Sequence, residues 1–147
     1  MIDRINLSRR VAMQFGLLSI LLLSGCGKSE PWNKVYPVNG VVTYKGKPVK
    51  DAELAFFPLD EQVPDLVRPF ARTNENGEFS LTTFNHGDGA PAGKYKVTVV
   101  HHEVVVVKDI MTAKPNNLPR KYSNRDSSDL VIEVASRETA LEPFELR

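Results

Sequence analysis

The amino-acid sequence predicts an all-β protein, a β-sandwich of about seven antiparallel strands with Greek-key connections. Three observations predict this fold class. Short runs rich in Val, Tyr and Phe alternate between apolar and polar residues, as half-buried strands do. Clusters of Gly, Pro and Asn separate these runs, as turns do. No long segment after residue 34 has the three-and-four spacing of apolar residues that an amphipathic helix needs.

The first predicted strands lie at the start of this domain. Residues 35–44 are rich in Val and Tyr, and residues 45–48, Lys-Gly-Lys-Pro, have the composition of a turn. Residues 52–57 alternate in polarity, with Leu54 and Phe56 on one face, and a proline ends the run. We therefore expect Phe56 to point into the core.

A tight turn is predicted in the middle of the chain. Residues 59–68 have loop composition, and strands are predicted at 70–73 and 78–83. Between these strands, residues 74–77 read Asn-Glu-Asn-Gly, and Asn and Gly tolerate the positive φ of a hairpin turn. Residues 84–93 contain three glycines and a proline, which predicts a second loop.

The C-terminal part begins with the clearest strand. Residues 94–100 alternate, with Tyr95 and Val97 on the face that we expect to be buried. Residues 104–107 either prolong this strand or begin another. Residues 111–125 contain two prolines and are expected to be irregular. Two further alternating runs predict the last strands: 130–134 and 144–146.

The N-terminal 25 residues are typical of a signal peptide. A basic start is followed by an apolar run over residues 11–23. This run is shorter than the stretch of about 20 residues that crosses a bilayer as a helix. We expect three parts: a signal peptide over 1–25, a lipidated cysteine and tether over 26–34, and the β-sandwich domain over 35–147.

The segment Leu23-Ser24-Gly25-Cys26 resembles the bacterial lipobox. The resemblance implies cleavage between Gly25 and Cys26 and a diacylglyceryl group on the Cys26 sulfur. Two or three acyl chains hold a protein on a membrane, at about 0.8 kcal/mol per buried methylene. The resemblance also implies that the residue after the cysteine affects sorting, and a glycine there, Gly27, slightly favours transport of the lipoprotein to the outer membrane. The alternatives are an ordinary signal peptide cut elsewhere, or a Cys26 thiol that stays free or forms an intermolecular disulfide.

Composition narrows the possible partners. The chain has 147 residues and one cysteine, so no internal disulfide can form. Residues 26–147 carry 16 basic and 17 acidic residues. Nucleic-acid binding needs a basic surface, so this balance argues against nucleic acid as a partner.

Several segments in order resemble the carboxypeptidase regulatory-like domains, which have a transthyretin-like sandwich. These segments are residues 36–42, 46–49, 52–58, 73–79 and 91–99. More narrowly, the chain is similar to small lipoproteins common in planctomycetes, through Asp-Gly-Ala-Pro at 88–91 and Leu-Pro-x-x-Tyr at 118–122. The resemblance covers residues 35–146 and implies a transthyretin-like fold, but a fold does not define a function.

Four glycines are expected to shape the backbone. Gly40 lies within a strand, which predicts a bulge or a close approach of another backbone segment. Gly46 allows the first turn, and Gly77 is expected in the left-handed conformation. Gly93, two residues after a proline, is expected to fix the start of the next strand.

The sequence contains no recognisable catalytic motif, phosphate-binding loop or metal-ligand spacing, so we expect no catalytic residue, cofactor or metal. His101 and His102 are adjacent, and adjacent strand side chains point to opposite faces, so we interpret them as a solvated strand end. We expect His86 and Asp88 to bond to the backbone of their loop. The alternative is that these two side chains bind an ion or a sugar.

These observations predict a non-enzymatic, exported lipoprotein of the cell envelope, attached to the membrane through Cys26, with a structural or partner-binding role. The partner would be an envelope protein or a glycan. The alternative is a carbohydrate- or peptide-binding module that uses the 84–93 loop, with Trp32 or Tyr122 as a stacking surface. A third possibility is an enzyme whose catalytic residues are dispersed along the chain.

Overall fold

The computed structural model describes residues 30–147. The predicted signal peptide, its cleavage site at Gly25 and Cys26, and the lipid on Cys26 lie outside the described residues. The described chain forms two short 3-10 helices and thirteen strands, and none of its helices has the length and apolar character needed to cross a membrane. The elements in order are η1 (Pro31–Asn33), β1 (Val35–Tyr36), β2 (Val38–Tyr44), β3 (Lys47–Pro48), β4 (Glu53–Pro58), β5 (Phe70–Arg72), β6 (Glu78–Ser80), β7 (Ala90–Pro91), β8 (Gly93–Val100), β9 (Val104–Val107), β10 (Ile110–Ala113), η2 (Arg120–Ser123), β11 (Val131–Val134), β12 (Thr139–Ala140) and β13 (Phe144–Leu146).

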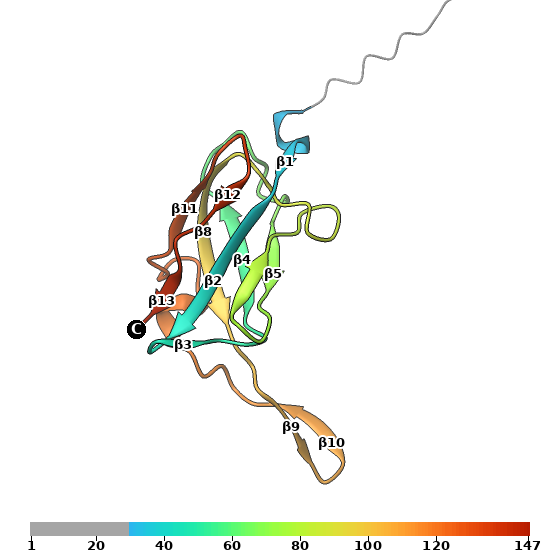
Figure 1. Ribbon diagram of the computed structural model, residues 1–147, viewed down its shortest axis with the longest axis vertical. Helices are drawn as coiled ribbons and strands as arrows, with labels where there is room; N and C mark the ends of the chain where they lie inside the picture. The colour runs from blue at the N-terminus through green and yellow to red at the C-terminus, as the bar shows by residue number, and fades with distance from the viewer. Residues whose placement is uncertain (1–29) are drawn as a thin grey trace, which may run out of the picture.

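Two sheets pack face to face around a single core (Figure 1), so the predicted all-β sandwich is confirmed. One sheet has the strand order β11-β8-β4-β5. The other is built around β2, which pairs with β3, β6, β12 and β13. β1 pairs with β7, and β9 pairs with β10, as two separate two-stranded ribbons.

The expectation of purely antiparallel pairing is wrong at the C-terminus. β12 and β13 both run parallel to β2, with Thr139 opposite Val38 and Phe144 opposite Val42. After β11, the chain crosses from one sheet to the other before β12 begins, so it arrives beside β2 in the same direction as β2. A crossing of this kind allows parallel neighbours, whereas a tight hairpin joins antiparallel ones.

Alternation correctly predicted the buried face of the central strands. Phe56 of β4 and Val97 of β8 are fully buried, as expected, and lie opposite each other in the sheet. The Phe79 ring of β6 packs between the sheets, with ring centroids 6.2 Å from Phe56 and 5.9 Å from Phe144. Aromatic packing of this kind contributes a large part of the stability of a small core.

Gly40 was expected to mark a bulge or a close backbone contact, and the structure corrects this expectation. The β2–β6 ladder is regular through Gly40, which lies opposite Phe79. A Cβ placed on Gly40 would lie 2.5 Å from Cζ of the Phe79 ring. The glycine therefore leaves room for an aromatic side chain rather than for another backbone segment.

Residues 111–113, expected to be irregular, belong to strand β10. The chain turns at Lys108 and Asp109, whose φ angles are 51° and 63°, and β10 pairs back on β9. Two successive positive φ angles define the type of two-residue turn that matches the twist of a hairpin. This turn was not predicted because its first position is Lys108, a residue type that seldom adopts a positive φ.

The Asn74–Gly77 turn forms as predicted, but the two strands that it connects enter different sheets. The Asn74 N–H donates to the Glu78 carbonyl oxygen over 2.8 Å, and Phe70 and Thr82 exchange two hydrogen bonds of 2.9 Å. Between these pairs, β5 joins β4 and β6 joins β2. The hairpin therefore opens in its middle and forms a corner of the sandwich.

Three buried hydroxyl groups reinforce the core. The Thr73 hydroxyl accepts from the Ala52 N–H over 2.8 Å and donates to the Val49 carbonyl oxygen over 2.6 Å. The Tyr95 hydroxyl donates to the Pro91 carbonyl oxygen over 2.8 Å, and burial raises the pKa of Tyr95 above its usual range. The Ser128 hydroxyl donates to the Val97 carbonyl oxygen in β8. Among the described residues, every buried polar side-chain atom has a hydrogen-bond partner.

Candidate functional site

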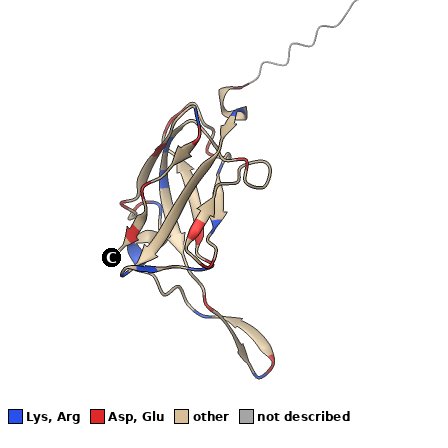
Figure 2. Cartoon of the chain, in the orientation of Figure 1, with Lys and Arg blue, Asp and Glu red and all other residues tan. Residues whose placement is uncertain are grey.

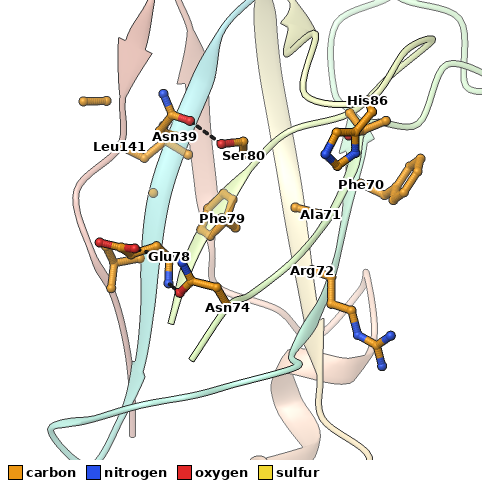
Figure 3. Close-up of a pocket in the computed structure, with 14 residues that line it drawn as sticks. Asn39, Phe70, Ala71, Arg72, Asn74, Glu78, Phe79, Ser80, His86 and Leu141 are labelled. Carbon is orange, nitrogen blue, oxygen red and sulfur yellow. Dashed lines mark hydrogen bonds between the residues drawn. The ribbon is translucent and has the colours of Figure 1, made fainter. Parts of the chain in front are cut away.

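A groove of about 690 Å³ lies at the corner where β5 and β6 separate (Figure 3). We call it the corner groove. Its lining comes from β2, β5, β6, the 84–93 loop and the chain around β12. These segments are far apart in the sequence and come together because each sheet takes one strand of the opened hairpin.

The backbone of the opened hairpin frames the corner groove. The Phe70–Thr82 pair closes one end, and the bond between Asn74 and Glu78 closes the other. Between these ends, Arg72 and Ser80 occupy the facing positions, and no backbone hydrogen bond of the described chain joins them. Because both ends are closed, an extended peptide cannot lie along the gap as an added strand, whereas a compact ligand can enter from the side.

Polar side chains line the corner groove on more than one side. The Ser80 hydroxyl donates to the Asn39 side-chain oxygen over 2.6 Å. This bond orients the Asn39 amide and leaves its Nδ2 donor without a partner among the described residues. The His86 ring lies at the upper side of the groove (Figure 3) and is exposed. The groove thus presents an amide, a hydroxyl and an imidazole.

The charged groups of the corner groove have partners of their own. The Arg72 guanidinium lies 3.5 Å from the Asp51 carboxylate and 3.7 Å from that of Glu53. The Glu78 carboxylate accepts from the Asn74 side-chain amide over 2.9 Å. The Arg72 charge is therefore partly compensated by two carboxylates, whereas the Glu78 carboxylate is hydrogen-bonded but not neutralised, so the groove does not favour an anionic ligand.

Apolar side chains complete the lining. The Phe70 side chain is 55% exposed and stands at the rim, while the Phe79 ring lies at the base among core residues. Leu141 borders the opposite side, beyond Asn39 (Figure 3). The corner groove therefore combines an exposed aromatic ring with hydrogen-bonding groups, as small-molecule sites commonly do.

Asp88 organises the loop that carries His86. Its carboxylate accepts hydrogen bonds from the backbone N–H groups of Thr83, Phe84 and Asn85, over 2.7, 3.0 and 2.8 Å. The expectation that Asp88 bonds the loop backbone is confirmed. The His86 ring makes no hydrogen bond within the described chain, so its expected backbone bond is absent and it stays available at the groove.

The two aromatic residues expected as stacking surfaces lie elsewhere. Tyr122 is only 3% exposed, and its hydroxyl accepts from the Arg147 N–H over 3.2 Å, so the expectation of a stacking surface is wrong. Its side chain closes the core beneath η2. Trp32 packs on Phe84 with 6.5 Å between ring centroids, outside the corner groove.

The adjacent histidines have separate structural roles. His101 Nδ1 lies 2.8 Å from the Asn117 side-chain oxygen, and His102 Nδ1 lies 3.0 Å from the Lys114 carbonyl oxygen. Both contacts hold the base of the β9–β10 hairpin. Within residues 30–147, no three His, Cys, Asp or Glu side chains are grouped as a metal site would require.

The remaining predicted glycines lie outside the groove. Gly46 is in the turn after β2, with φ of 75°, and Gly77 ends the corner turn, with φ of 74°. Gly93 starts β8 with φ of 150°, next to the Asp60 carboxylate, which accepts from the Lys94 N–H over 2.7 Å. Gly89, which no sequence pattern singled out as a turn glycine, is also required, because a Cβ there would lie 1.7 Å from the Tyr36 carbonyl oxygen.

No family model and no curated protein sequence matches this chain. Solved structures with some similarity include a 9R-lipoxygenase from Cyanothece PCC8801, at 14% identity and a TM-score of 0.41, covering 78% of this chain and 17% of the lipoxygenase. A Pseudomonas aeruginosa protein whose proposed role is carbohydrate binding has 14% identity and a TM-score of 0.39, covering 76% of this chain and 91% of that protein. A DUF3823 family protein from Parabacteroides merdae has 14% identity and a TM-score of 0.41, over 76% of this chain and 45% of that protein. This chain therefore spans less than a fifth of the lipoxygenase and under half of the DUF3823 protein, and none of these similarities identifies its family.

Proposed function

We propose that this protein is an exported, lipid-anchored and non-enzymatic binding module whose corner groove holds a neutral saccharide. One observation carries the proposal. The groove brings together Asn39, Ser80 and His86, whose side chains can form hydrogen bonds, and the exposed ring of Phe70. Sugars present hydroxyl groups on their edges and C–H groups on their faces, so amide, hydroxyl and aromatic groups together match them.

A saccharide fits this groove better than a peptide or an anion. A peptide bound as an added strand needs an open sheet edge, and both ends of this gap are closed by backbone hydrogen bonds. An anion needs uncompensated positive charge, and the Arg72 guanidinium already faces two carboxylates. A neutral ligand with several hydroxyl groups needs neither an open sheet edge nor an uncompensated positive charge.

The membrane attachment is proposed from the sequence. The resemblance of residues 23–26 to a lipobox supports acylation of Cys26 and export to the cell envelope. The nine residues of the tether, 26–34, reach at most about 30 Å when fully extended. The sandwich would then stay near the membrane surface, where envelope glycans are found. Membership in the carboxypeptidase regulatory-like family is likewise proposed, and the sandwich fold supports it.

The absence of catalysis is part of the same proposal. The groove pairs its one carboxylate, Glu78, with an amide rather than with a second acid or a histidine base. Glycoside hydrolysis commonly uses two carboxyl groups on either side of the scissile bond. With one carboxylate held by Asn74, we expect the bound saccharide to remain intact.

Glycan binding by the purified full-length chain tests the proposal. We expect neutral oligosaccharides to bind, and binding to fall at least about tenfold in the double variant Asn39→Ala, His86→Ala, which removes two groove contacts. His102→Ala is the matched control, because it removes an exposed imidazole outside the groove, and it should bind like the wild type. Equal binding by the double variant, or binding of anionic glycans only, would refute the saccharide assignment.

The same assay tests the non-enzymatic role. After incubation with the protein, the bound oligosaccharide should be recovered with unchanged mass. Appearance of shorter products that depend on Glu78 would instead show a glycosidase. A Glu78→Gln variant distinguishes the two outcomes, since it keeps the shape of the side chain.

A further inference from the structure

We propose that the β9–β10 hairpin pairs with the same hairpin of a second copy of this chain, edge to edge and antiparallel, through β9. The hairpin projects from the end of the sandwich opposite to η1 (Figure 1). It forms a two-stranded sheet that no other strand of the described chain joins. This surface is distinct from the corner groove.

Both faces of the hairpin are apolar and exposed. Val106 and Met111 share one face and are 67% and 77% exposed, and Val107 and Ile110 share the other and are 51% and 66% exposed. An isolated two-stranded hairpin is at best marginally stable in water. A projecting hairpin with this composition therefore needs a partner to cover it.

The free edge of β9 is suited to strand pairing. The Lys114 N–H donates to the Glu103 carbonyl oxygen over 2.8 Å, so the backbone groups of Glu103 point towards β10. Because these directions alternate along an antiparallel strand, the N–H and C=O groups of Val104 and Val106 point away from β10 and are free to bond another strand. All four residues of β9 are Val, which favours strand formation, whereas β10 contains Thr112 and Ala113.

The charges of the hairpin favour a second copy in the antiparallel direction. They lie at the two ends, at the tip in Lys108 and Asp109 and at the base in Glu103 and Lys114, while the strands between are uncharged (Figure 2). The Glu103 carboxylate accepts from the Lys114 ammonium over 2.8 Å. Antiparallel pairing brings the Glu103–Lys114 pair of one copy to the Lys108–Asp109 tip of the other, whereas parallel pairing would place Glu103 beside Glu103 of the second copy.

The backbone directions limit the register, and the charges select within it. Val104 can bond with Val106 of the second copy, because both present outward groups, and Val105 then lies opposite itself on the twofold axis. In this register Glu103 lies opposite Val107 of the second copy, one position from Lys108. A shift that places Val106 on the axis would bring Glu103 opposite Asp109, two like charges, and is disfavoured.

A lipid bilayer is a less suitable partner for this hairpin. The tip would enter first, and it carries Lys108 and Asp109, whose side chains would have to leave water. Strand pairing keeps both charges at the surface and adjacent to opposite charges. We therefore commit to the second copy and treat lipid binding as an outcome of the test.

Cysteine cross-linking of the full-length protein in the bacterial envelope tests the pairing. Val105→Cys places two thiols across the axis at a non-hydrogen-bonded position, where side chains are closest, so mild oxidation should yield a disulfide-linked dimer. Thr112→Cys is the matched control, since Thr112 is the cross-strand neighbour of Val105 but lies on β10. We expect its cross-linked fraction to be under about a tenth of that of Val105→Cys, and the wild type, with Cys26 alone, gives the background.

Charge substitution supplies a second measurement that does not depend on the cysteines. Lys108→Glu should weaken self-association about fivefold, and Lys108→Arg should leave it unchanged, as judged by analytical ultracentrifugation in mild detergent. Equal cross-linking of the two cysteine variants, or a monomer at all concentrations, would overturn the proposal. A fluorophore on Met111→Cys that is quenched by nitroxide-labelled phosphatidylcholine in vesicles, without any dimer, would overturn it in favour of a lipid partner, because this signal reports the hairpin and not the anchor at Cys26.

Discussion

Replacing Gly77 by Ala, compared with the same change at Gly46, separates two reasons for a glycine in a turn. Both residues have nearly the same backbone, with φ of 74° and 75°. An added Cβ therefore costs about 1–2 kcal/mol at either position because L residues resist this conformation. The two positions differ in their surroundings, so the difference in cost measures packing alone.

The space around Gly77 is filled by backbone. A Cβ there would lie 2.4 Å from the Val42 carbonyl oxygen and 3.3 Å from Pro48 Cα, whereas nothing lies within 4 Å at Gly46. The Gly77 carbonyl oxygen also accepts the Val42 N–H over 2.8 Å, so the turn cannot move away without losing that bond. Loss of this hydrogen bond would cost about 1–3 kcal/mol. Gly77→Ala should therefore lower the free energy of unfolding by about 2–5 kcal/mol, and Gly46→Ala by about 1–2 kcal/mol.

Urea unfolding of both variants, followed by circular dichroism, provides the comparison. The free energies of unfolding should differ by at least about 1 kcal/mol, with Gly77→Ala the less stable protein. A difference under about 0.5 kcal/mol would refute the packing argument, because it would lie within the error of comparing separate sites. The Gly46→Ala variant is the control for a general effect of Gly→Ala substitution in a turn.

Four further changes test the core, the buried hydroxyls and the anchor. Phe56→Ala should lower the free energy of unfolding by about 3–5 kcal/mol in urea, since it empties a fully buried aromatic site. Thr73→Val should cost about 1–3 kcal/mol in the same assay, because two buried backbone groups lose their hydroxyl partner, and an unchanged stability would mean that water replaces it. Tyr95→Phe should cost about 1 kcal/mol at pH 7. Because the folded pKa of Tyr95 is raised, its contribution is complete below the unfolded pKa of about 10 and is lost as the pH rises further, so the variant should lose less stability than the wild type in that range. Cys26→Ser should abolish incorporation of labelled fatty acid and leave uncleaved precursor, and a mature wild-type N-terminus other than an acylated Cys26 by mass spectrometry would refute the lipobox assignment.

Local patterns determined the strands whose two faces differ. Leu54 and Phe56 in β4, and Tyr95 and Val97 in β8, are buried as their alternation predicted. The physical reason is that a strand next to a core can hide only every second side chain, so the sequence itself records which face is inside. The same reasoning located the last strand, although its parallel direction depends on a crossing between sheets that no local pattern records.

The β9–β10 hairpin shows where local rules are insufficient. Its turn places Lys108 and Asp109 at positive φ, a conformation that Asp tolerates but Lys seldom adopts. Its strands are apolar on both faces, so alternation could not identify them as a pair. Register and the pairing of Val107 with Ile110 became visible only in the structure.

The sequence by itself determined the all-β class, the buried faces of the central strands and the Asn74–Gly77 turn. Its lipobox-like segment is also the basis of the proposed lipid anchor. Only the tertiary structure decided that the two arms of this turn enter different sheets, and this separation creates the corner groove. Asn39 and His86 are 47 positions apart in the chain, and they meet at the groove because β2 binds β6 while β4 binds β5. Turn chemistry acts over a few residues, whereas the choice of sheet partner depends on which arrangement buries the most apolar surface of the whole domain.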